Sequence, residues 1–139
     1  MIVDASVVLS GFFPDEEQAQ AQALIREHVM GRVELVAPTL LLYEVTNAVV
    51  QARRRGRISD EQAGNILTSF EGLGIALKPV TWQQMLPLAR RFDRSAYDAA
   101  YLALAETCKQ RLITSDRRLY NAVHEHLDWV QWIGDYQQA

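Results

Sequence analysis

Four acidic residues occupy positions where carboxylates could act together as a chemical site. Asp4 and Asp116 each follow a short apolar segment and are expected just past the end of a strand. Glu44 interrupts an apolar helical pattern, and Asp98 falls in the first turn of a predicted helix. Four carboxylates in one crevice would repel one another unless positive charge lay among them. Because they have no histidine or cysteine partner, their oxygens favour Mg²⁺ or Mn²⁺ over zinc.

Each of these residues also has an ordinary structural explanation. A carboxylate in a first helical turn favours the helix dipole, which could be all that Asp98 does. Glu44 could be held in a salt bridge with an arginine, because buried charges are usually paired. Ser6 and Thr114 lie beside two of the acids and could hold a carboxylate or a metal-bound water, or could only cap or turn the chain. Asn47, three residues after Glu44, shares its helical face.

Short apolar segments alternate with longer segments of helical periodicity along the chain. Strands are predicted at 1–3, 33–37, 75–80, 112–114 and 129–133, and helices at 14–30, 39–55, 59–73, 82–92, 95–105 and 116–125. This order is typical of an α/β fold, a parallel sheet with helices on both faces. Such sheets bind ligands beyond the carboxyl ends of their strands, near the point where strand order reverses. The four acids are therefore expected to point into one crevice.

Several helix boundaries are marked by residues that favour them. Ser95 and Thr39 are predicted to cap the helices that follow them. Pro14-Asp-Glu-Glu17 is expected to open the first helix, with acids in its first turn. Pro87 is expected to kink the helix over 82–92 or to break it in two.

Length and composition fit one compact domain. The chain has 139 residues, of which 49% are hydrophobic, so 1–139 is predicted to be a single domain. Cys108 is the only cysteine, which excludes an intramolecular disulfide and a zinc cluster built from cysteines. No apolar run approaches the roughly 20 residues of a membrane span, and no basic leader precedes the first strand. We therefore expect a soluble, cytoplasmic protein without a membrane partner.

The net charge of −3 conceals a separation of acids from bases. Without the four acids the charge becomes +1, so cations bound among them would leave a protein that need not repel a polyanion. Arginine supplies 12 of the 14 basic residues, and its planar fork suits phosphate oxygens. The arginine clusters at 53–57, 90–94 and 117–118 could equally be helix ends and solvated faces. Those flanking the acidic motifs, and predicted to contact phosphates, are Arg90, Arg91, Arg94, Arg117 and Arg118.

Four short motifs resemble those of a known nuclease family. They are Asp4-Ala-Ser6, Glu44-Val-Thr-Asn47, Tyr97-Asp-Ala-Ala-Tyr-Leu-Ala-Leu-Ala105 and Thr114-Ser-Asp116. They resemble the four acidic motifs of PIN-domain ribonucleases, and their order, separation and the chain length are similar to those of VapC toxins from bacterial and archaeal toxin–antitoxin pairs. The resemblance spans nearly the whole chain. The chain departs from the pattern at Tyr43, where a small hydroxyl is common, and at Thr46, where alanine is.

The resemblance implies a fold and a site. The implied fold is a three-layer α/β/α sandwich around a central, mostly parallel sheet of five strands. The implied metal-binding and catalytic acids are Asp4, Glu44, Asp98 and Asp116, with Ser6, Asn47 and Thr114 in support. With Mg²⁺ or Mn²⁺ bound, such a site hydrolyses RNA phosphodiesters by metal-activated water and leaves 5′-phosphate and 3′-hydroxyl ends.

The resemblance also implies partners. Structured RNA such as tRNA or ribosomal RNA is the implied substrate, while a VapB-like antitoxin and a second copy of the chain, in a homodimer, are the implied protein partners. Phe12 and Phe13 beside Pro14 are expected to form an apolar rim that a partner segment could cover. Two alternatives stay open: a housekeeping RNA-processing nuclease with no antitoxin, and a PIN-fold binding module that cuts nothing. A neighbouring gene for a small protein would favour the toxin.

Overall fold

The computed structural model describes residues 1–14 and 17–138. Within these ranges five short strands form one sheet: β1 (Ile2–Val3), β2 (Val36–Pro38), β3 (Ala76–Lys78), β4 (Leu112–Thr114) and β5 (Val130–Trp132). Their spatial order is β3-β2-β1-β4-β5, and every neighbouring pair is parallel. The predicted five-stranded sheet is therefore confirmed, and it is parallel throughout.

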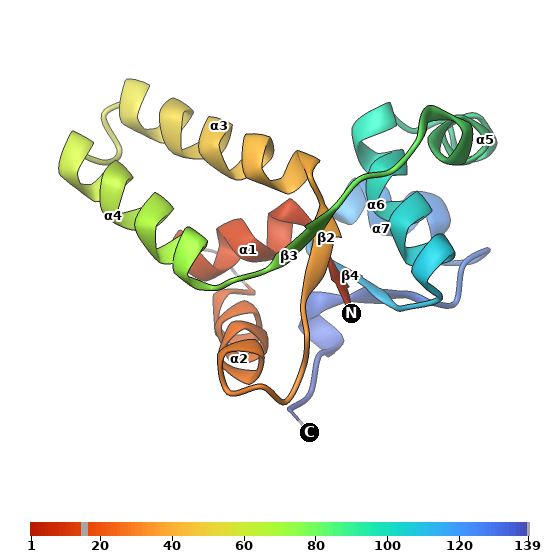
Figure 1. Cartoon of the computed structure of the whole chain (residues 1–139), viewed down its shortest axis with the longest axis horizontal. Helices are drawn as coiled ribbons and strands as arrows, with labels where there is room; N and C mark the ends of the chain where they lie inside the picture. The colour runs from red at the N-terminus through yellow and green to blue at the C-terminus, as the bar shows by residue number, and fades with distance from the viewer. Residues whose placement is uncertain (15–16, 139) are drawn as a thin grey trace.

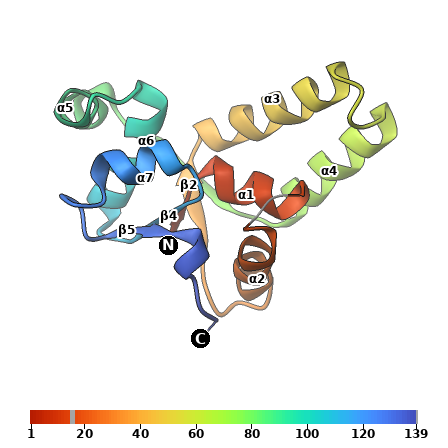
Figure 2. The same cartoon turned by 180° about the vertical axis from the view of Figure 1, so that it is seen from behind.

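Helices cover both faces of this sheet. Those of the described residues are α1 (Ala5–Phe12), α2 (Gln18–Val29), α3 (Leu40–Arg54), α4 (Asp60–Gly72), α5 (Trp82–Phe92), α6 (Ala96–Cys108) and α7 (Arg117–Val123), with a 3-10 turn, η1 (Ile133–Asp135), after β5. Figures 1 and 2 show α1 to α4 on one side of the molecule and α5 to α7 on the other, with the sheet between them. The predicted three-layer sandwich is confirmed. Among the described helices, none combines the length and the apolar character that crossing a membrane requires.

The sequence pattern does not predict α1, which begins directly after Asp4. Val7 and Val8 of this helix are fully buried, and α1 packs against α2, α3 and β4. Because β-branched residues have a low helix propensity, tertiary packing rather than local preference accounts for α1. The helix predicted over 14–30 is α2, which begins at Gln18. Residues 15 and 16, at the predicted start, lie outside the described residues.

The structure confirms one predicted helix cap and differs from two other predictions about the helices. Ser95 caps α6 as predicted, since its Oγ accepts a 3.1 Å hydrogen bond from the backbone N–H of Asp98. Thr39 does not cap α3, because its own backbone is helical (φ −54°, ψ −26°) and its side chain forms no cap bond. An N-cap residue needs extended backbone to reach the first turn. For Pro87 the sequence predicts a kink or a break, and the break does not occur: α5 continues through this residue and packs along α6, which offsets the one helical hydrogen bond that a proline removes.

The central helix and the strand order together create the place where a site can form. All residues from Ala99 to Ala105 of α6 are buried, whereas the sequence pattern predicts one buried face. Contacts with α5 on one side and with β1, β2 and β4 on the other enclose this helix. The chain runs outward from β1 to β3 and then returns across the sheet to β4, so strand order reverses between β1 and β4. Their carboxyl ends mark the switch point where α/β sheets bind ligands.

Candidate active site

Two hydroxyl groups hold the carboxylate of Asp4 at the end of β1. Ser6 Oγ and Thr114 Oγ1 donate hydrogen bonds to Asp4 Oδ2, over 2.8 Å and 2.7 Å. The same two hydroxyls accept hydrogen bonds from the backbone N–H groups of Ser115 and Asp116, each over 3.0 Å. Side chains thus join the ends of β1 and β4 across the switch point. The structure shows Ser6 and Thr114 holding a carboxylate, and their bonds to backbone N–H groups show that they also shape the turn after β4.

Asp116 stands two residues after the end of β4 and is the N-cap residue of α7. Its Oδ1 accepts hydrogen bonds from the backbone N–H groups of Arg118, over 3.0 Å, and Leu119, over 3.2 Å. These bonds fix the carboxylate at the start of the helix, where the helix dipole also favours negative charge. They engage one oxygen, so Oδ2 of Asp116 remains for other contacts.

Glu44 lies in the second turn of α3 and is half-buried. Its Oε1 accepts a 2.6 Å hydrogen bond from the phenol hydroxyl of Tyr101, a residue of α6 whose side chain is 1% exposed. Burial raises the pKa of Tyr101, with the Asp4 and Glu44 carboxylates adding to the effect, so the hydroxyl keeps its proton. The sequence leaves open a salt bridge between Glu44 and an arginine. The structure shows the hydrogen bond to Tyr101 instead, since no ion pair of the described residues includes Glu44.

Asp98 faces a cation as well as its own helix. Its Oδ2 lies 3.9 Å from Nη1 of Arg94, one turn earlier in the chain, and both side chains are about three-quarters buried, with exposed fractions of 27% and 26%. Ser95 already caps α6 by accepting a hydrogen bond from the backbone N–H of Asp98, so the helix does not need the Asp98 carboxylate as a cap. Its position in the first turn nonetheless favours the helix dipole, and this part of the structural explanation holds.

Burial and the charges of neighbouring acids raise the pKa values of Asp4, Glu44 and Asp98. Burial raises the pKa of Asp4 to about 6. The hydrogen bonds from Thr114 and Ser6 lower this pKa in part, and the charges of Glu44 and Asp116 raise it. Burial also raises the pKa of Glu44, which is lowered by its hydrogen bond and raised further by Asp98 and Asp116. The pKa of Asp98 is raised by burial and by the charge of Asp116, while the guanidinium of Arg94 lowers it in part. These charge–charge effects link each of the four predicted acids to at least one other, because such effects weaken with distance.

These residues fit a hard divalent cation by their chemistry. In the described part of the chain, no three acid, histidine or cysteine side chains stand close enough to hold a metal ion as they are placed. The fit therefore rests on the donors and their charge. The hydrogen bonds engage one oxygen each of Asp4, Glu44 and Asp116, so a second oxygen remains on each. Carboxylate oxygens suit Mg²⁺ and Mn²⁺, and a cation among these acids would relieve the repulsion between them.

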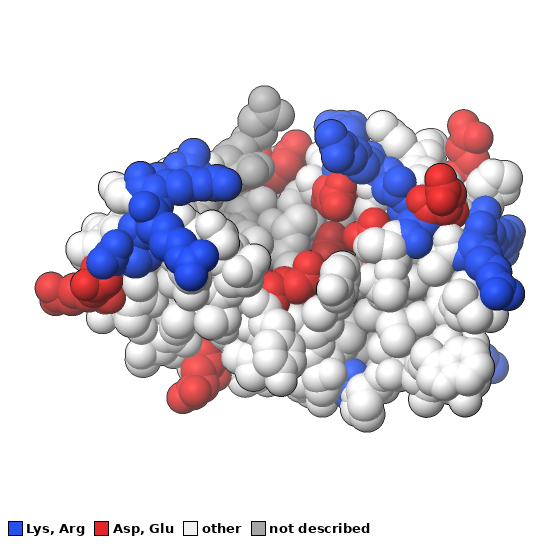
Figure 3. Space-filling model, turned by 90° about the horizontal axis from the view of Figure 1, so that it is seen from above, with Lys and Arg blue, Asp and Glu red and all other residues white. Residues whose placement is uncertain are grey.

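Basic side chains lie on either side of acidic ones on the face of the molecule that is drawn in Figure 3. Figure 3 shows acidic side chains in the hollowed middle of this face and groups of basic side chains on either side. The arginines predicted to contact phosphates flank the acids along the chain, at the end of α5 and the start of α7: Arg90, Arg91, Arg117 and Arg118 are exposed, and Arg94 is half-buried. The guanidinium of Arg117 lies 4.0 Å from the centre of the Trp132 ring, and that of Arg91 lies 4.7 Å from the Phe92 ring. Both contacts restrict where these arginines point.

One member of the site is not predicted by the sequence pattern, and the role of one predicted member is not tested by the structure. The hydroxyl of Tyr101 belongs to the acidic site, although the pattern assigns this residue only to a buried helical face. Its position three residues after Asp98, on the same face of the helix, was the available signal. Asn47 is exposed on α3, and no hydrogen bond of the described residues joins it to an acid. Its supporting role stays a prediction.

The fold and the site together define a class of protein. It is a parallel α/β domain with an enclosed central helix and with acidic residues at the switch point of its sheet. The model of the PIN domain family matches residues 1–125. The chain therefore belongs to the PIN domain family, and the predicted resemblance is confirmed.

Named relatives and a solved structure are similar to most of the chain. The ribonuclease VapC3 of Pyrobaculum aerophilum is 33% identical over 123 residues, which cover 86% of this chain and 91% of that protein. The ribonuclease VapC9 of Mycobacterium tuberculosis is 30% identical over 119 residues, which cover 86% and 87%. The crystal structure of PAE2754 from Pyrobaculum aerophilum aligns with a TM-score of 0.73 at 22% identity, over 96% of this chain and 83% of that one. This last similarity supports the fold alone.

Proposed function

We propose that this protein is an endoribonuclease, the toxin of a toxin–antitoxin pair, that hydrolyses RNA phosphodiesters. The observation that carries the proposal is the gathering of four carboxylates, three of them with raised pKa values, at the switch point of the sheet. The named relatives are ribonucleases of the VapC type and align with most of the chain, which supports the same activity here.

Asp4, Glu44, Asp98 and Asp116 would hold Mg²⁺ or Mn²⁺, which supplies an activated water, polarises the scissile phosphate and stabilises the leaving oxygen. The protein's own groups position these acids. Ser6 and Thr114 fix one oxygen of Asp4, and backbone N–H groups of α7 fix one oxygen of Asp116. Asn47, one turn beyond Glu44, is assigned a supporting role toward the substrate or its water. The products would carry 5′-phosphate and 3′-hydroxyl ends.

The arginines next to the acids, on the α5 to α7 side of the molecule, would bind the RNA backbone. Arg90 and Arg91 lie at the end of α5, and Arg94 lies between α5 and α6. Arg117 and Arg118 begin α7, and of the five only Arg94 is not exposed. Guanidinium groups pair with phosphate oxygens through two parallel hydrogen bonds. A row of guanidinium groups beside the acids supports a structured RNA such as tRNA or ribosomal RNA as the substrate, and from this substrate we infer a cytoplasmic location.

Cleavage of RNA by the purified protein tests this function. Incubation with tRNA and with ribosomal RNA in Mg²⁺ or Mn²⁺ should give discrete fragments whose 5′ ends accept ligation without prior phosphorylation. EDTA should stop the reaction, and Asp116→Asn should abolish it. Asp128→Asn, at an exposed aspartate outside the site, is the matched control and should cut at the rate of the unmodified protein. Equal cleavage by the Asp116→Asn protein and its control would refute the assignment.

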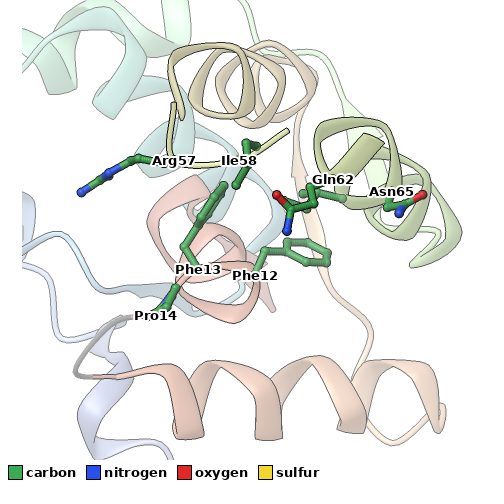
Figure 4. Close-up of a pocket in the computed structure, with 8 residues that line it drawn as sticks. Phe12, Phe13, Pro14, Arg57, Ile58, Gln62 and Asn65 are labelled. Carbon is green, nitrogen blue, oxygen red and sulfur yellow. The ribbon is translucent and has the colours of Figure 1, made fainter. Parts of the chain in front are cut away.

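The proposed antitoxin would cover an apolar groove beside α1. This groove of about 530 Å³ is lined by Phe12, Phe13, Pro14, Arg57, Ile58, Gln62, Asn65 and Ile66. In Figure 4 the ring of Phe13 extends from the end of α1 toward Ile58, and the side chain of Arg57 extends away from this apolar surface. A helical segment with apolar residues on one face and a carboxylate for Arg57 would suit these groups. Co-expression with a small adjacent gene tests the partner, and Ile58→Asp should prevent co-purification. A chain with no such gene and no co-purifying peptide would instead favour the housekeeping nuclease.

The proposed homodimer would cover a second apolar region. Tyr43 and Tyr97 are 70% and 64% exposed and line a groove together with Met85. Trp82 and Leu86, one turn apart on α5, are also exposed. Large exposed apolar side chains in one region commonly mark a protein interface. Sedimentation at micromolar concentration should show a dimer, and Tyr43→Glu should shift it to monomer. A monomeric unmodified protein would refute the dimer without affecting the nuclease assignment.

A further inference from the structure

Tyr101 connects two separate parts of the acidic site. It belongs to α6, one turn after Asp98, and its hydroxyl donates a 2.6 Å hydrogen bond to Oε1 of Glu44 on α3. The side chain is 1% exposed and lies among the fully buried residues of the central helix. The hydroxyl is thus fixed by the core, whereas the carboxylate that it contacts is only half-buried.

This bond determines which oxygen of Glu44 is available. A glutamate side chain has three rotatable bonds, and holding it in one conformation costs conformational entropy that a short hydrogen bond to a rigid donor offsets. Oε1 is engaged by Tyr101, while no hydrogen bond or ion pair among the described residues engages Oε2. Burial raises the pKa of Glu44, and the charges of Asp98 and Asp116 raise it further, so this carboxylate interacts electrostatically with both acids.

We propose that Tyr101 is a positioning residue of the nuclease site, which holds Oε1 of Glu44 so that Oε2 is presented to a divalent cation or to the attacking water. The inference rests on the proposed nuclease function and deepens it. A merely structural tyrosine at this place would need only its ring, because phenylalanine fills nearly the same volume of the core. The hydroxyl of Tyr101 instead meets a carboxylate of the site, and burying a hydroxyl is favourable only where it finds such a partner.

The variant Tyr101→Phe removes this hydroxyl and keeps the ring. Groups that orient metal ligands typically contribute about 10–100-fold in metal affinity or activity, so the variant should bind Mn²⁺ more weakly or cleave RNA more slowly by a factor in this range. Mn²⁺ binding is measured by calorimetry on the protein alone, and cleavage under single-turnover conditions. RNA affinity, measured in EDTA, should not change. Tyr136→Phe removes the hydroxyl of a half-buried tyrosine outside the site and is the matched control.

A double-mutant cycle separates positioning from folding. If Tyr101 acts through Glu44, then Tyr101→Phe should have no further effect on Mn²⁺ affinity or residual cleavage in a Glu44→Ala background. Glu44→Asp provides a second variant with an intact Tyr101: it keeps the charge but is one methylene shorter, and it should reproduce the loss. Thermal melts in EDTA show whether each variant is folded.

Three results would overturn the inference: full Mn²⁺ affinity and cleavage in the Tyr101→Phe protein, an equal loss with and without Glu44, or full activity in Glu44→Asp. If the unmodified protein cuts no RNA, the proposed function fails, and the Mn²⁺ titrations still decide whether Tyr101 positions Glu44.

Discussion

Replacing Asp4 with asparagine should stabilise the metal-free protein at neutral and alkaline pH. Burial raises the pKa of Asp4 from 3.8 to about 6, and at about 1.36 kcal/mol per pKa unit the ionised carboxylate costs the folded state about 3 kcal/mol. The folded protein binds this proton more tightly than the unfolded chain does, so stability falls as the pH rises from about 4 to about 6 and stays low above that range. An asparagine carries no charge, and its carbonyl oxygen can still accept the hydrogen bonds of Ser6 and Thr114.

Urea unfolding in EDTA at pH 8 and pH 4 measures this effect. We expect Asp4→Asn to raise the free energy of unfolding by about 1–3 kcal/mol at pH 8, the lower end allowing for an amide that fits less well, and by little at pH 4. Asp128→Asn, at an exposed position, should change neither value. A variant that is less stable than the unmodified protein at pH 8, or that gains equally at both pH values, would refute the reasoning.

Three further predictions concern RNA, the hydroxyl network and the metal. Replacing both Arg117 and Arg118 with alanine should lower the log–log salt slope of RNA binding by about 0.7–0.9 per lost phosphate contact, and unchanged affinity and slope in filter binding would show this cluster to be a solvated helix end. Thr114→Val removes a donor to Asp4 and the acceptor for the N–H of Asp116, so it should lower the free energy of unfolding by about 1–3 kcal/mol. Mn²⁺ at about 100 times its dissociation constant should stabilise the unmodified protein by about 2.7 kcal/mol and the Asp4→Asn protein by less, and equal gains in melting temperature would argue against Asp4 as a ligand.

Residues that follow strands were predictable from the sequence because their role depends on topology. A strand that ends at an acid, in a chain where strands and helices alternate, places that acid at the carboxyl edge of a parallel sheet. Asp4 and Asp116 illustrate this, and the five predicted strands all form. The capping role of Ser95 was also predictable, because the hydroxyl and the backbone N–H that it binds lie only three residues apart in the chain.

Features that depend on tertiary packing were not predictable in this way. The valines of α1 favour a strand by local preference, and they become helical because the sheet and α2 bury them. The hydrogen bond from Tyr101 to Glu44 joins residues 57 positions apart, and no local pattern specifies such a pair. Thr39 shows the converse, since a suitable cap residue goes unused when its own backbone joins the helix.

Asp98→Asn tests most directly whether the four acids form a metal-dependent nuclease site. The pKa of Asp98 is raised by burial and by Asp116, so a neutral amide should leave the metal-free fold as stable as before or more stable. The same amide is a poor ligand for a hard cation, and Mn²⁺-dependent cleavage of structured RNA should be abolished. The measurement pairs thermal melts in EDTA with cleavage assays in Mn²⁺ on the same preparation. A protein that loses about 0.3–1 kcal/mol of stability, as expected for an acid that serves only its helix dipole, and still cuts RNA at the unmodified rate would contradict this account.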